Sequence, residues 1–153
     1  MPVKGCLPYT GVLNNTAQGG TDSVWDLRDS APTSAEVNPT HLYGNTGTYV
    51  VKLTAIDTTT CNRTDIYTFS ITVYSIPSAG FSFSPNPAQQ NKPANFNNFS
   101  TGAVSYSWDF GDGQTSAETD PIHQYNATGT FHTCLVAFNA AGCTDTFCLD
   151  VPA

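Results

Sequence analysis

Basic residues are the scarcest group in this sequence, with five Lys and Arg against twelve Asp and Glu among 153 residues. The formal net charge is −7. Binding to nucleic acid relies on clustered Lys and Arg that neutralise phosphates, so this shortage excludes DNA or RNA as a partner. No apolar run approaches the roughly 20 residues that a membrane helix needs, and we therefore expect no membrane span.

Residues that favour helices are also sparse. Lys, Glu, Leu and Gln are few, and no long stretch repeats apolar residues with the helical spacing. Short runs rich in Val, Thr, Tyr and Phe instead alternate with Gly, Pro, Asn and Asp, which predicts an all-β fold. Five cysteines in a small, Lys-poor chain favour an oxidising compartment, so we expect the protein to be secreted or held at the cell surface.

The sequence contains an internal repeat. Trp25–Asp29 corresponds to Trp108–Asp112, and Thr46–Tyr49 corresponds to Thr128–Phe131. These correspondences keep their order along the chain, which is typical of a duplicated domain. We therefore predict two domains: a divergent copy over residues 1–75, whose first strand is short or truncated, and a second copy over residues 76–153.

Within each copy, apolar side chains recur at every second position, the period of a strand with one buried face. Each tryptophan lies in such a strand, a position that fits the core tryptophan of an immunoglobulin-like sandwich better than a sugar-stacking role. The predicted core residues are Trp25, Tyr49 and Leu53 in the first copy and Trp108, Phe131 and Leu135 in the second. The first copy is expected to close with a strand that carries Tyr67, Phe69, Ile71 and Val73.

Three segments of the second copy form a recognisable pattern. They are Ser107–Gly113 with a WDFGDG turn, Asp120–Tyr125 with a PxHxY element, and Gly129–Phe131 at the start of a strand. Together they resemble the signature of the polycystic-kidney-disease (PKD) repeat. The first copy departs from that signature at Leu27–Ser30, which replaces Phe-Gly-Asp-Gly and leaves the shape of the turn open there.

The resemblance implies two tandem seven-stranded immunoglobulin-like β-sandwiches without catalytic activity. Such modules act as spacers, adhesive units or ligand-binding units in extracellular proteins. The style of the sequence is similar to secreted and cell-surface multi-repeat proteins of Bacteroidetes bacteria. On this basis we expect a structural or adhesive module that contacts neighbouring repeats of the same chain and a protein or carbohydrate ligand. Two alternatives stay open: a polysaccharide- or collagen-binding accessory module of a secreted hydrolase, and a self-assembling surface filament subunit.

The acidic residues of the turns are candidate metal ligands. Asp109 and Asp112 supply the oxygen donors that calcium prefers, and Asp26 and Asp29 are their counterparts. Aspartate in turns more commonly hydrogen-bonds the backbone, so this structural role is the favoured interpretation, and we predict no cofactor apart from a possible calcium ion.

Catalysis is disfavoured. The paired carboxylates lie in a tight turn, and a small sandwich with short loops offers little concave space for a reacting group. His41 and His123 occupy equivalent positions in the two copies, which favours a structural role at a turn or strand end. The histidines also lack the spacing of a zinc site.

The cysteines predict disulfides. Folding the last hairpin of the second copy places Cys134 opposite Cys148 on the outward face, within bonding reach. Cys6 has two candidate partners: Cys61 within the first domain, or Cys143, which lies on a hairpin expected to point back toward the first domain. We favour Cys6–Cys143, because Cys6 is expected to lead into the second strand, at the end of its domain opposite Cys61.

Overall fold

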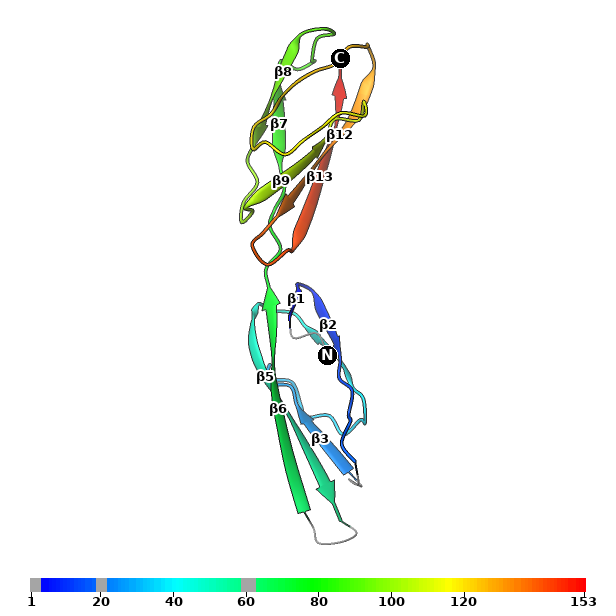
Figure 1. Ribbon diagram of the computed structural model, residues 1–153, viewed down its shortest axis with the longest axis vertical. Helices are drawn as coiled ribbons and strands as arrows, with labels where there is room; N and C mark the ends of the chain where they lie inside the picture. Colours follow the sequence, from blue (N-terminus) through cyan, green and yellow to red (C-terminus); the bar gives the residue numbers. More distant parts are fainter. Residues whose placement is uncertain (1–3, 19–21, 59–62) are drawn as a thin grey trace. The chain divides into compact units, whose positions relative to one another are not determined.

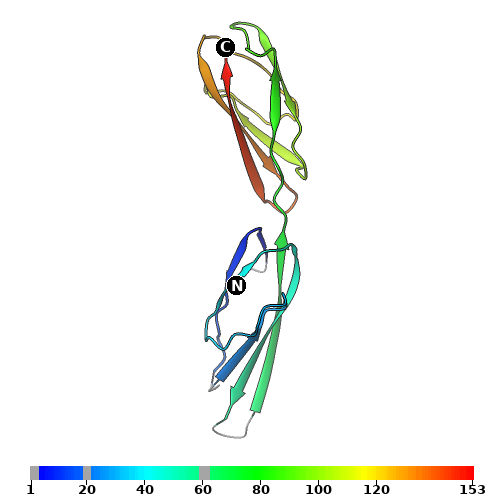
Figure 2. The same ribbon diagram turned by 180° about the vertical axis from the view of Figure 1, so that it is seen from behind.

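The computed structural model describes residues 4–18, 22–58 and 63–153, and these form strands and connecting loops (Figures 1 and 2). The chain divides into two units, Met1–Ser75 and Ile76–Ala153. The prediction of an all-β fold is confirmed, since no helix is found among the described residues. In that part of the chain there is accordingly no helix able to cross a membrane.

The second unit is a sandwich of two antiparallel sheets. Its seven strands are β7 (Phe81–Ser84), β8 (Pro93–Asn98), β9 (Ser105–Asp109), β10 (Thr115–Ser116), β11 (Ile122–Gln124), β12 (Thr130–Phe138) and β13 (Thr144–Pro152). One sheet has the order β10-β9-β12-β13, and the facing sheet has the order β11-β8-β7. Figure 1 labels β9, β12 and β13 of the first sheet and β7 and β8 of the second. Trp108, Leu135 and Phe96 are buried between them, together with Phe81, Phe110, Tyr125 and Val151.

The first unit has the same plan with one strand fewer among its described residues. Its strands are β1 (Lys4–Cys6), β2 (Tyr9–Val12), β3 (Asp22–Asp26), β4 (Thr40–Tyr43), β5 (Gly47–Asp57) and β6 (Arg63–Tyr74). The larger sheet has the order β1-β6-β5-β3, and β2 pairs with β4 in the smaller one. The short β1 runs parallel to β6, and β2 has no described strand on the side where β8 has β7.

The predicted core is correct for four of its six residues. Trp25, Leu53, Trp108 and Leu135 are all buried, with side chains between 0% and 6% exposed. Tyr49 and Phe131 are only half-buried and pack against the edge of each core. Both lie within the first three residues of their strands, β5 and β12.

The closing strand β6 carries Tyr67, Phe69, Ile71 and Val73, as predicted. Ile71 and Val73 are buried in it, but Tyr67 is 64% exposed, a difference along the strand that the sequence did not predict. Cys6 is the last residue of β1, opposite Tyr74 of β6, and β2 begins three residues later at Tyr9.

The turn after each tryptophan strand keeps one shape in both units despite different sequences. In the second unit it contains Gly111 and Gly113, with φ of 80° and 88°. Arg28 and Ser30 take these places in the first unit and adopt φ of 62° and 71°. A left-handed conformation is strained for residues with a Cβ atom, so the first unit keeps the turn at a cost in stability.

We expect Ser30→Gly to raise the free energy of unfolding of the first unit by about 1 kcal/mol, because glycine relieves this strain. Gly113→Ala should lower that of the second unit by a similar amount, although the added methyl group meets no atom within 4 Å. Urea unfolding measures both effects, since each unit holds one tryptophan as a fluorescent reporter. If Ser30→Gly left the urea midpoint of the first unit unchanged or lowered it, the backbone of Ser30 would not be strained.

Candidate functional site

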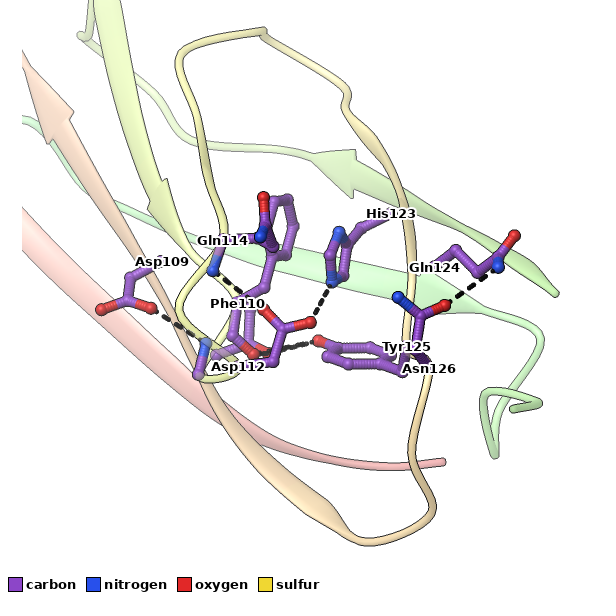
Figure 3. Close-up of polar contacts among 10 residues, drawn as sticks. Asp109, Phe110, Asp112, Gln114, His123, Gln124, Tyr125 and Asn126 are labelled. Carbon is purple, nitrogen blue, oxygen red and sulfur yellow. Dashed lines mark hydrogen bonds and ion pairs between the residues drawn. The ribbon is translucent and has the colours of Figure 1, made fainter. Parts of the chain in front are cut away.

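Two aspartates hold the turn that follows β9 (Figure 3). The Asp109 carboxylate accepts a hydrogen bond from the backbone N–H of Gly111 at 2.9 Å, and that of Asp112 accepts one from Gln114 at 3.0 Å. Gly111 also lies against a neighbouring strand, since a Cβ atom there would fall 2.7 Å from the carbonyl oxygen of His132. This is the backbone-bonding role that the sequence favours for aspartate in a turn.

The second oxygen of Asp112 reaches a histidine on the other sheet. Oδ2 lies 2.8 Å from Nε2 of His123, and because a carboxylate only accepts, Nε2 carries the proton (Figure 3). The His123 ring stacks on Phe110, with centroids 4.0 Å apart, and meets the edge of Tyr125 at 4.7 Å. The two polar side chains are 11% and 17% exposed, so most of the pair is shielded from water.

A buried hydroxyl pair completes this arrangement. The hydroxyl oxygens of Tyr125 and Thr133 lie 2.8 Å apart, and each lies within hydrogen-bond distance of the Phe110 carbonyl oxygen, at 3.2 and 3.1 Å. Burial raises the pKa of Tyr125, which stays protonated and able to donate. This network was not predicted from the sequence. The residue that could have indicated it is Thr133, a polar residue on the inward, otherwise apolar face of a strand.

The first unit repeats the turn. The Asp29 carboxylate accepts a hydrogen bond from the Ala31 N–H at 3.1 Å and another from Nε2 of His41. The His41 ring meets Tyr43 edge-on at 4.7 Å, as His123 meets Tyr125. Asp26 accepts hydrogen bonds from the backbone and side chain of Arg28.

The two units differ in how well their buried polar groups are satisfied. Val51 stands where the second unit has Thr133, and the hydroxyl of Tyr43 has no hydrogen-bond partner among the described residues. The indole N–H of Trp25 is also unpaired within that part of the chain, whereas the Trp108 indole donates to the Glu118 carbonyl at 2.8 Å. Burial, with the charge of Asp29, raises the pKa of Tyr43 to about 12.

The structure assigns the predicted site residues to structural contacts. Both oxygens of Asp112 and one of Asp109 accept hydrogen bonds, and calcium binding by this pair stays a prediction. Across residues 4–18, 22–58 and 63–153, the one cluster of three possible metal-ligand side chains consists of His132, Cys134 and Cys148. Its two cysteines are oxidised, so neither can offer a thiolate.

Cys134 and Cys148 face each other in the β12–β13 register and form a disulfide with an S–S distance of 2.08 Å. Beside it on the outward face, Nδ1 of His132 lies 2.8 Å from an Asp150 oxygen. Cys61 lies outside the described residues, and the pairing proposed from the sequence for Cys6 and Cys143 stays a prediction.

Comparison with known proteins gives matches in both units. Models of the PKD domain match residues 7–73 and residues 78–148. Collagenase ColA of Bacillus cereus is 43% identical over an alignment that covers 33% of this chain and 6% of the collagenase. A microbial collagenase of Vibrio alginolyticus is 46% identical over 28% of this chain and 5% of its own length. The solved PKD1 domain of the Vibrio cholerae metalloprotease PrtV is 30% identical, with a TM-score of 0.44, over 51% of this chain and 99% of that domain. The chain therefore spans only a small part of either collagenase.

The contribution of the buried hydroxyl pair to stability can be tested by exchanging the residues at the equivalent positions Thr133 and Val51. Thr133→Val is expected to lower the free energy of unfolding of the second unit by about 1–2 kcal/mol, because Tyr125 loses one partner while the shape is kept. Val51→Thr places a hydroxyl beside the unpaired Tyr43 hydroxyl, so the two can form a hydrogen bond. We therefore expect this substitution to lower the free energy of unfolding of the first unit by less than about 0.5 kcal/mol. A buried hydroxyl without a partner would lower it by about 1–3 kcal/mol. Urea unfolding measures both, and equal losses would contradict the pairing.

Asp29 makes the stability of the first unit depend on pH in the acid range. Burial raises the pKa of this carboxyl, but the hydrogen bonds from His41 and the Ala31 N–H outweigh it and hold the pKa below its usual 3.8. Its contribution to stability is present above that value and is lost as the pH falls through the lowered pKa. Asp29→Asn should flatten this loss in urea midpoints measured between about pH 2 and pH 6. Glu36→Gln, at an exposed carboxylate of the same unit, is the control, and an acid limb unchanged in Asp29→Asn would refute the assignment.

Proposed function

Because this chain belongs to the PKD domain family, as two copies in tandem, we propose that it is a non-catalytic accessory module of a larger extracellular protein. In this role it spaces the other parts of that protein and holds them on a polymeric target. The tandem matches over both units support the module. The collagenases, of which it resembles a small part, support the setting.

The proposal rests on the contacts that the ionisable side chains make. A catalytic role would need the two aspartate–histidine pairs, Asp112 with His123 and Asp29 with His41. In both units the aspartate and the histidine bond to each other, and the aspartate also accepts a hydrogen bond from a turn N–H. Neither Asp29 nor His41 is among the described residues that line a groove of about 490 Å³ on the first unit. A general acid or base must instead reach a substrate held in a pocket.

The strands supply what a spacer needs. β5 pairs with β6 along its full length, and β12 and β13 pair along theirs with a disulfide between them. A disulfide limits the unfolded chain and is stable in an oxidising compartment, which supports a location outside the cell. Paired strands of this kind suit a module that holds its neighbours apart.

The targets that the proposal allows are collagen, suggested by the names of the relatives, and polysaccharide. We expect the chain to sediment with one of these insoluble polymers and to release no soluble fragments from it. The reduced, unfolded chain is the control for non-specific adsorption. Release of peptides or sugars by the purified chain would overturn the non-catalytic role, and failure to sediment with any polymer of either class would overturn the holding role.

A further inference from the structure

A groove of about 490 Å³ lies on the first unit. Asp65, Tyr67 and Phe69 of β6 line it, and Asn14 and Thr16 of the loop between β2 and β3 contribute polar groups. Buried Trp25 and Leu53 connect it to the core. A volume of this size falls within the range of small-ligand sites.

The groove exists because an apolar stripe continues beyond the layer that covers it. Alternate residues of β6 share one face, and along it Val73 and Ile71 are buried, Phe69 is half-buried, and Tyr67 is 64% exposed. Figure 1 shows β2 ending well short of the far part of the β5–β6 hairpin. The rings of Tyr67 and Phe69 are neighbours, with centroids 6.1 Å apart and planes at 33°.

At the matching place the second unit has side chains that pack against its core. By register with Leu135 and Thr133, the counterparts of Tyr67 and Phe69 are Phe147 and Leu149, and both pack against the core. The aromatic groove is therefore a feature of the first copy and not a requirement of the fold.

The lining indicates the class of ligand. A pyranose ring has an apolar C–H face that stacks on an aromatic ring and a rim of hydroxyls that both donate and accept. The groove offers ring faces beside a carboxylate, an amide and a hydroxyl, which suit that rim. No Lys or Arg is among its described lining residues, so a polyanion would find no partner there. A proline-rich peptide fits less well, since it offers mainly carbonyl acceptors and few donors for Asp65.

We propose that this groove binds neutral polysaccharide, with a sugar ring stacked on Tyr67 and its hydroxyls hydrogen-bonded to Asp65 and Asn14. The inference rests on the proposed function, because it names the class of polymer that the module holds. It adds a site, in the first copy alone, at which that polymer is recognised.

Affinity electrophoresis of the full chain through gels that contain soluble β-glucan, xylan or mannan tests this directly. We expect at least one polysaccharide to retard the chain, and Tyr67→Ala to weaken that retardation roughly tenfold, the equivalent of about 1.4 kcal/mol. Ile66→Ala is the matched control, because Ile66 is the next residue of β6, points to the opposite face and is 55% exposed. Since Tyr67 is itself largely exposed, its truncation should leave the fold intact, which the urea midpoint verifies.

Asp65→Asn tests the polar half of the site and should weaken the same retardation less than Tyr67→Ala does. NMR titration with oligosaccharides of the retarding polymer should shift the Tyr67 ring and Asn14 side-chain signals. The proposal is overturned if none of the three polysaccharides retards the chain, or if Tyr67→Ala and Ile66→Ala behave alike. Binding to collagen that survives Tyr67→Ala, without binding to polysaccharide, would overturn this site while leaving the accessory role in place.

Discussion

A hydrogen bond between an aspartate and a histidine joins the two layers of the sandwich in each unit. Asp112 follows β9 of the larger sheet, and His123 lies in β11 of the facing one, so the bond between them crosses the core edge. Asp29 and His41 make the same connection between β3 and β4. The carboxylate also fixes its own turn through a backbone N–H. One carboxylate therefore fixes its own turn and ties it to the facing sheet, and in the second unit the rings of Phe110 and Tyr125 pack against the histidine that it holds.

The two copies show how much chemistry can change around this bond without changing the fold. The second copy has glycines in the strained turn positions and a hydroxyl partner for its buried tyrosine. The first copy has Arg28 and Ser30 in the turn, and it leaves polar atoms of Trp25 and Tyr43 unpaired among the described residues. Each unpaired buried group costs about 1–3 kcal/mol, so the first unit should be the less stable of the two. Trp25, whose indole N–H is unpaired among the described residues, also lines the groove.

The sequence was informative wherever a local pattern decides the structure. The repeat, the tryptophan strands and the Cys134–Cys148 pairing follow from alternation and register, which are short-range properties. It did not predict the exposure of Tyr67, because that exposure depends on where a strand of the other sheet ends. It also left open whether Arg28 and Ser30 could keep the glycine turn, since that depends on the balance between local strain and the contacts of Asp29. The groove joins Asn14 to Asp65, residues far apart in the chain, and no motif marks such a site.

These differences bear on where function can reside in such a chain. The residues that make the signature recognisable are the ones committed to turn and layer contacts, so they maintain the fold and cannot distinguish one ligand from another. Recognition must come from positions that the layer contacts leave free, and these are the positions at which the copies diverge. At the Tyr67 position the second copy uses a core-packing phenylalanine and the first an exposed tyrosine. The exposed Tyr67 ring lies beside Phe69 and lines one groove with Asp65 and Asn14, so ring faces and polar groups are available together at this position of the first copy.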